Sequence, residues 1–167
     1  MNEFVIEKVI KEKEKIRTQI SKGLEVYRDD KGFLFFDASD RTFNNDLISL
    51  DENELEVLLM TIKRSTKILL TTKCLFLLQK SQWTRIEGNE IDDFELMSML
   101  DANPEENDPA IIRAYKIYKL RRQKGYFRIL KKDGSFYEIY LPKREFVYGL
   151  TDAIKKLQFV TRKYEAI

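Results

Sequence analysis

Residues 125–142 read GYFRILKKDGSFYEIYLP, and this stretch predicts an antiparallel hairpin. Aromatic-rich runs of alternating character flank Asp133-Gly134, the preferred residue pair for a two-residue hairpin turn. Alternation of this kind is typical of strands with one buried and one solvated face. The chain is therefore expected to contain antiparallel sheet.

Residues 67–96 extend the strand pattern towards the N-terminus. Three apolar segments, KILLTT, CLFLLQ and WTRIEGNEIDDFEL, are separated by short polar breaks at Thr72-Lys73 and at residues 80–82. Runs rich in Leu, Ile, Phe and Trp with polar breaks between them predict a meander of antiparallel strands. Cys74 lies inside this apolar region and is expected to be a buried core thiol.

The two ends of the chain predict amphipathic helices. Apolar residues recur at helical spacing from residue 2 to about residue 21, among many Glu and Lys residues. After Pro142 a second apolar face runs from Val147 to Tyr164. The sequence therefore predicts an α+β fold with an N-terminal helix and a C-terminal capping helix.

Three further segments carry short or ambiguous secondary-structure signals. Residues 24–37 predict two short strands around the turn residues Asp29–Gly32. Residues 51–63 begin with Asp51 and Glu54, which form a helix capping box, yet the run LEVLLMTI suits a buried strand equally well. Residues 109–124 can start as a helix at Asp108-Pro109, and a strand is the rival interpretation.

The order of these elements resembles the pleckstrin-homology-like barrels, in particular the bacterial and GRAM-type members. Lys67–Leu78 (KILLTTKCLFLL) is similar to an apolar strand ending in Leu-Thr, a short turn and a second apolar strand. Trp83–Phe94 (WTRIEGNEIDDF) resembles the strand that follows, and Gly125–Ile167 resembles the last hairpin and capping helix. The resemblance covers roughly residues 55–167.

That resemblance implies an antiparallel barrel, or a strongly bent sheet, plugged by the C-terminal helix. Members of the family mostly bind lipids or proteins and rarely catalyse reactions. The basic motif with which eukaryotic members bind phosphoinositides has only Lys63, Arg64 and Lys67 as candidates here. We expect residues 1–54 to form a helix and hairpin packed on this 55–167 domain, in one structural unit.

Composition excludes several classes of enzyme. The chain has 167 residues, of which 43% are hydrophobic and 35% charged, as in ordinary globular proteins. It contains no histidine and one cysteine, so Ser-His or Cys-His catalysis and cysteine zinc sites are impossible. Six scattered glycines form no phosphate-binding loop. We expect no catalytic residues, metal or cofactor, and a cytoplasmic location.

Charges are sorted along the chain although the net charge is only +2. Residues 86–112 contain nine acids and no base, and residues 113–132 contain nine bases and no acid. The two segments can pair with each other across a sheet, or the acidic one can project as a negative lobe that attracts a basic partner. Aromatics among the bases are expected to face the core.

Two sets of candidate binding residues follow from this sorting. The acidic set, for contact with another protein such as a basic toxin or nuclease domain, comprises Asp92, Asp93, Glu95, Asp101, Glu105, Glu106 and Asp108. The alternative set, for nucleic acid or an anionic membrane, comprises Arg113, Lys116, Arg121, Arg122, Lys124 and Arg128. The leading hypothesis is a non-enzymatic binding protein of the immunity, toxin-neutralising type.

Overall fold

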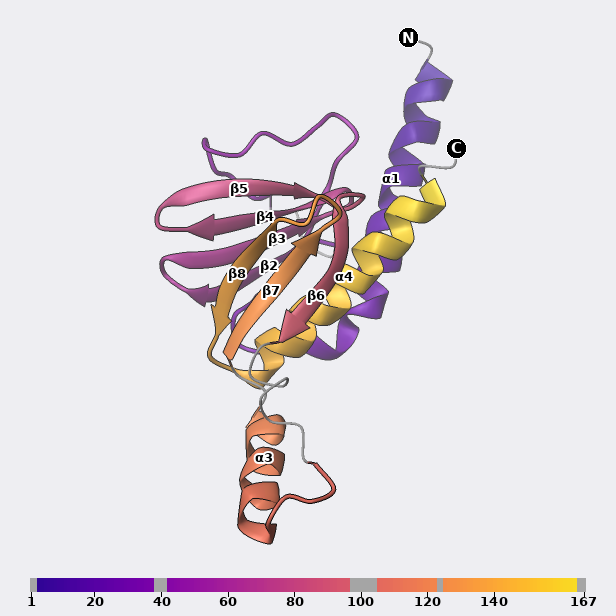
Figure 1. Cartoon of the computed structure of the whole chain (residues 1–167). Helices are drawn as coiled ribbons and strands as arrows, with labels where there is room; N and C mark the ends of the chain where they lie inside the picture. The colour runs from indigo at the N-terminus through magenta and orange to yellow at the C-terminus, as the bar shows by residue number, and fades with distance from the viewer. Residues whose placement is uncertain (1–2, 38–41, 97–104, 123–124, 165–167) are drawn as a thin grey trace. The chain divides into compact units, whose positions relative to one another are not determined.

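The computed structural model describes residues 3–37, 42–96, 105–122 and 125–164 (Figure 1). It confirms the α+β class: a helix comes first, eight antiparallel strands form two sheets, and a helix comes last. The described strands do not close into a barrel. The chain divides into two compact units, residues 1–89 with 152–167 and residues 90–151. The boundary expected at residue 54 stays a prediction.

The first unit contains the five-stranded sheet and the N-terminal helix. Its elements are α1 (Glu3–Gly23), the 3₁₀ helix η1 (Glu25–Tyr27), β1 (Phe33–Phe35), β2 (Glu56–Lys63), β3 (Thr66–Thr71), β4 (Cys74–Gln79) and β5 (Gln82–Glu87). The strands lie side by side in sequence order, each antiparallel to its neighbour. Strands β3 to β5 confirm the predicted meander as far as Glu87, whereas residues 91–96, which were expected to continue it, belong to the other sheet. Cys74 is fully buried as expected.

In its described residues, the second unit contains a three-stranded antiparallel sheet and the helix α3. Its elements are β6 (Ile91–Leu96), α3 (Ala110–Arg122), β7 (Gly125–Lys131) and β8 (Phe136–Leu141). The last helix, α4 (Arg144–Tyr164), begins in this unit and ends in the first one. None of the described helices has both the length and the apolar character needed to cross a bilayer.

Residues 51–63 illustrate how burial decides between helix and strand. The capping-box contacts form, since the Asp51 amide donates to Glu54 Oε2 at 3.2 Å, but they close a turn and no helix follows. Residues 57–60 of the next strand, β2, are all buried, and β2 pairs with β1 on one side and β3 on the other. A strand that is buried on both faces has a continuously apolar sequence, which cannot be told from that of a buried helix.

The structure resolves the other two segments. Residues 110–122 form helix α3, so the strand alternative for this region is wrong. Of residues 24–37, only Phe33–Phe35 are a strand, and the first of the two predicted strands is the 3₁₀ helix η1. Leu24 and Tyr27 are both buried, a spacing of three residues that suits a helical turn. The Tyr27 hydroxyl also donates to Asp152 at 2.6 Å, tying η1 to α4.

The β7–β8 hairpin does not have the predicted two-residue turn, whereas the β4–β5 hairpin has one. The β7–β8 hairpin exists, but its loop spans residues 132–135, and only Gly134 has a positive φ, of 84°. A two-residue type I′ turn needs two positive φ angles. In the described chain that pattern belongs to the β4–β5 hairpin, where Lys80 and Ser81 have φ of 49° and 65° and Gln79 pairs with Gln82.

This turn generates a prediction about stability. Replacing Lys80→Asn together with Ser81→Gly should raise the free energy of unfolding by about 1 kcal/mol, because Asn and Gly adopt left-handed φ at lower cost than Lys and Ser. Urea unfolding measures the change. Lys132→Asn, at a loop position without positive φ, should leave the stability unchanged. An equal gain in both variants would contradict the explanation.

Candidate functional site

The solvent-facing side of the second sheet carries an unusual set of side chains. Residues that pair across antiparallel strands point to the same face, and the register therefore places two acids of β6 beside alternate residues of β7 and β8. We call this surface the outer aromatic face; its members are Asp93, Glu95, Tyr126, Arg128, Leu130, Phe136, Glu138 and Tyr140.

Three aromatic rings are open to solvent on the outer aromatic face. Tyr126, Phe136 and Tyr140 are 54%, 50% and 42% exposed. The rings of Tyr126 and Tyr140 lie 5.4 Å apart, and the Arg128 guanidinium lies 4.6 Å from the centre of the Phe136 ring. Large exposed rings that gather on one face are typical of interaction surfaces.

The expectation that the aromatics among the bases of residues 113–132 face the core is wrong for Tyr126, and also for Tyr115 and Tyr118, which are exposed. The sequence signal that was missed is a pair of aromatic doublets, Tyr126-Phe127 and Phe136-Tyr137. Successive strand residues point to opposite faces, so each doublet must place one ring outside whenever the other is in the core. Phe127 is fully buried, and Tyr126 therefore points to solvent.

Helix α3 is the second exposed feature of this unit. Ile111, Tyr115 and Tyr118 are each at least half exposed. Two cations of the helix contact the residues that precede it. The Lys116 ammonium lies 2.8 Å from Asp108 Oδ2, and the Arg113 guanidinium donates to the Glu106 carbonyl oxygen at 2.6 Å. The hydrogen bond from Lys116 lowers the pKa of Asp108 below its ordinary value.

These contacts account for much of the charge sorting. Lys116 of the basic segment pairs with Asp108 of the acidic one, and Lys131 lies 3.3 Å from Glu90. Cross-strand register places Glu95 opposite Arg128, whose Nε in turn donates to Glu138 at 2.9 Å. Each such surface pair contributes little stability, but together they cancel much of the local charge.

The predicted acids occupy two separate stretches of chain. Asp92, Asp93 and Glu95 lie on β6, whereas Glu105, Glu106 and Asp108 precede α3; Asp101 lies outside the described residues. Among the predicted bases, Arg113, Lys116, Arg121 and Arg122 belong to α3, Arg128 belongs to β7, and Lys124 lies outside the described residues. Of these thirteen residues, three, Asp93, Glu95 and Arg128, belong to the outer aromatic face.

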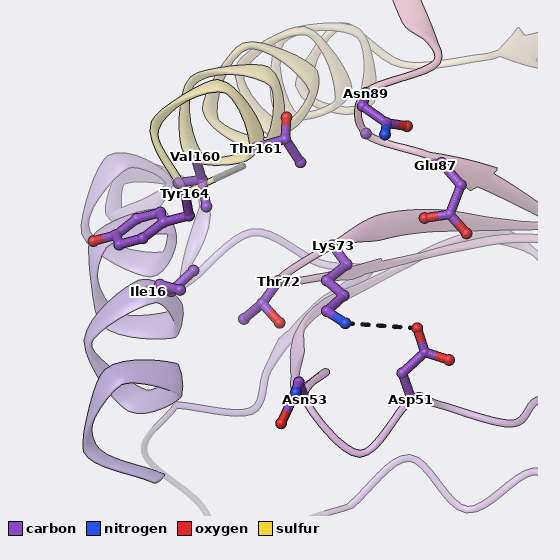
Figure 2. A pocket seen from close by; sticks show the side chains of 11 residues that line it. Ile16, Asp51, Asn53, Thr72, Lys73, Glu87, Asn89, Val160, Thr161 and Tyr164 are labelled. Carbon is purple, nitrogen blue, oxygen red and sulfur yellow. Dashed lines mark ion pairs between the residues drawn. The ribbon is translucent and has the colours of Figure 1, made fainter. Parts of the chain in front are cut away.

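The first unit contains a pocket of about 350 Å³ that sequence reasoning did not find (Figure 2). Ile16 of α1 and Val160 and Tyr164 of α4 form an apolar wall. The other lining residues are mostly polar and come from the turn before β2, the β3–β4 turn, the end of β5 and α4: Asp51, Asn53, Thr72, Lys73, Glu87, Gly88, Asn89 and Thr161.

Gly88 permits the close approach of α4 at the back of this pocket. A Cβ atom at this position would lie 2.7 Å from Thr161 Cγ2 and 2.9 Å from both Leu157 Cγ and the Lys73 carbonyl oxygen. Distances below 3.0 Å force neighbours to move. A side chain at residue 88 would therefore push the end of β5 away from α4 and change the pocket.

A buried carboxylate, that of Glu54, is linked through Arg85 to two carboxylates of the pocket lining. The Glu54 side chain is completely inaccessible to solvent. It accepts hydrogen bonds from the Thr71 hydroxyl, from Cys74 Sγ at 2.8 Å and from the Asp51 amide, and Arg85 Nη1 lies 3.1 Å from Oε2. A buried charge is tolerated only with partners of this kind.

Arg85 connects the buried Glu54 carboxylate to two carboxylates that line the pocket. Its guanidinium, held by Glu54, also lies 2.9 Å from Asp51 Oδ2 and 2.5 Å from Glu87 Oε1, so one cation orients two lining carboxylates. Lys73 adds a longer contact of 3.6 Å to Asp51, which Figure 2 shows as a dashed line. A planar guanidinium suits such multiple carboxylate contacts.

Cys74 is poorly suited to act as a nucleophile. Burial, followed by the hydrogen bond to Glu54, raises the pKa of the thiol far above its ordinary value, and the thiolate is the reactive form. Within the described residues, no group of three or more Cys, Asp or Glu side chains is arranged to hold a metal ion.

The buried carboxylate predicts a large effect of a small substitution. Glu54→Gln should lower the free energy of unfolding by about 2–4 kcal/mol, because the amide group would face donors and leave Arg85 without its buried partner. Thermal or urea unfolding measures the loss. Glu52→Gln, two residues away and exposed, should change stability by less than about 0.5 kcal/mol. Equal stability of both variants would show that Glu54 has no such role.

Reactivity of the single thiol gives an independent check. Cys74 in the folded protein should react with a disulfide reagent at pH 8 at least about 100-fold more slowly than in the urea-unfolded chain, because burial hinders access and suppresses the thiolate. Absorbance of the released thiol follows the reaction. Similar rates in the two states would contradict the buried position of the thiol.

Comparison with known proteins adds no relative. No protein-family model matches the sequence, and no curated protein and no solved structure matches it. The likeness to pleckstrin-homology-like barrels therefore stays a prediction, and function has to be inferred from the outer aromatic face and the pocket.

Proposed function

We propose that the protein is a non-enzymatic binding module that engages a basic protein partner through the outer aromatic face. One observation supports this most directly: the three exposed rings, Tyr126, Phe136 and Tyr140, share one sheet face with carboxylates. Tyr and Phe are enriched at protein interfaces, where they bury large areas at low cost in conformational entropy.

The charge of the face favours a basic partner. Asp93, Glu95 and Glu138 contribute three negative charges against the single positive charge of Arg128. Opposite charges across an interface accelerate encounter and select the partner, while buried aromatic rings supply most of the affinity. Arg128 pairs with Glu138 and contacts the Phe136 ring, so it offsets one of the three negative charges and the face stays acidic.

The toxin-neutralising form of this role is the version we favour. An inhibitor of a basic toxin or nuclease domain needs a compact scaffold and a negative contact surface, and it needs no catalytic groups. Two of the predicted contact acids, Asp93 and Glu95, lie on the outer aromatic face, and the chain has no histidine. Asp92 of the same strand is exposed and extends the acidic edge.

Binding of nucleic acid or an anionic membrane through α3 is a second candidate. Tyr115 and Tyr118 are exposed on a helix that also carries Arg113 and Lys116, and aromatic rings among cations can stack bases. However, the side chains of Arg113 and Lys116 already contact oxygen atoms of residues 105–108. This arrangement reduces the positive charge that α3 offers to phosphates.

Affinity capture with matched variants tests the proposal. Wild-type protein is used to capture partners from nuclease-treated lysate of the native cell at low and moderate salt. Tyr126→Ser with Phe136→Ser should abolish capture of a stoichiometric basic protein, and Asp93→Ser with Glu95→Ser should weaken it more at low salt. Phe159→Ser, at a ring of α4 that is also 54% exposed, should retain the partner.

The thermal unfolding of each variant shows that a loss of capture is not a loss of folding. Retention of the partner by the Tyr126/Phe136 variant would refute a role for the outer aromatic face. If untreated lysate yields only nucleic acid, and capture weakens steeply with salt, the α3 candidate replaces the proposal.

A further inference from the structure

The pocket of the first unit has a composition that selects a particular kind of ligand. We propose that it binds a small organic cation, namely a primary ammonium group attached to a short apolar body. This site lies wholly in residues 1–89 and 152–164. The inference is therefore independent of the outer aromatic face, which belongs to the other unit.

The size of the pocket limits the ligand. Its volume of about 350 Å³ lies at the small end of the range for small-molecule sites. The side chains of Ile16, Val160 and Tyr164 make one wall apolar, and Figure 2 shows them on the two helices, with Lys73 and Asp51 on the other side. A single short hydrocarbon or phenyl body fits such a wall.

The charges around the pocket leave a negative surplus. Three carboxylates, Asp51, Glu54 and Glu87, belong to one network with two cations, Lys73 and Arg85. Arg85 is not among the lining residues and contacts all three carboxylates. The network therefore carries one uncompensated negative charge, which a ligand cation would neutralise.

The lining carboxylates each have one oxygen left for the ligand. Arg85 uses Asp51 Oδ2 and Glu87 Oε1, and Lys73 also approaches Asp51 Oδ2. Among the described contacts, Asp51 Oδ1 and Glu87 Oε2 have no donor. A primary ammonium carries three N–H donors, and the side chains of Asn53 and Asn89 at the same pocket can accept further hydrogen bonds.

Arg85 makes these acceptors a preformed site. Because it is anchored on a carboxylate without solvent access, Asp51 and Glu87 are held in place before any ligand arrives. Preorganised groups lose less conformational entropy on binding. The arrangement resembles a support for ligand contacts more than a chance surface ion pair, since the supporting residue is itself tied into the core.

Three probes of similar shape and different charge test this inference. Backbone amide NMR of the full chain is titrated at neutral pH with 2-phenylethylamine, which is cationic, 2-phenylethanol, which is neutral, and 3-phenylpropionate, which is anionic. The amine should give saturable shifts at residues 51–53, 72–73 and 87–89 and bind at least about tenfold more tightly than the alcohol.

Matched variants assign the contact. Glu87→Gln should weaken binding of the amine about fivefold to tenfold and leave the alcohol unchanged, because it removes the charge and keeps an oxygen for Arg85. Asp29→Asn removes an exposed carboxylate of the same unit that does not line the pocket, and it should have no effect. Thr161→Phe, checked for folding by thermal unfolding, should block all three probes.

Several outcomes would overturn the inference. Absence of saturable shifts at the pocket shows that it is not a site for this class of compound. Equal affinity for amine and alcohol refutes the role of the carboxylates, and tighter binding of the propionate identifies Lys73 as an anion contact instead. An unchanged amine affinity in Glu87→Gln, or in a folded Thr161→Phe variant, places the ligand elsewhere.

Discussion

A single buried carboxylate organises the first unit. Glu54 has no access to solvent and receives donors from β3, β4, the turn before β2 and, through Arg85, β5. Because a buried charge without partners is costly, the chain must bring these segments together to bury it. The same contacts align Asp51 and Glu87 at the pocket, so the folding requirement and the binding geometry are properties of one network.

The elements that were predictable are those with strong local patterns. The first and last helices and the strands between residues 66 and 87 follow from apolar periodicity, and the β7–β8 hairpin follows from its alternation around Gly134. Residues 51–63 could not be assigned because a central strand and a buried helix are both continuously apolar. Only pairing with the next strand, β3, and with β1, which is distant in sequence, decides for the strand.

The sites were less predictable than the fold for a related reason. Asp51, Glu54, Thr71, Cys74 and Arg85 form one cluster although no short motif joins them, and the pocket also needs Ile16 and Tyr164 from opposite ends of the chain. Charge sorting is visible in the sequence, but whether acids project or pair depends on register. The aromatic doublets were the readable signal, because strand geometry alone requires one ring of each to point outward.

Helix α4 ties the completion of the first unit to residues that are synthesised well after its sheet. Residues 1–89 emerge from the ribosome well before residues 152–164, which supply buried Leu157 and Val160 and one wall of the pocket. Until then the five-stranded sheet lacks part of its core. At ordinary rates of translation this interval lasts several seconds, during which a nascent chain holds exposed apolar strands. The nascent chain therefore exposes apolar surface that chaperones can bind, whereas the folded protein buries it.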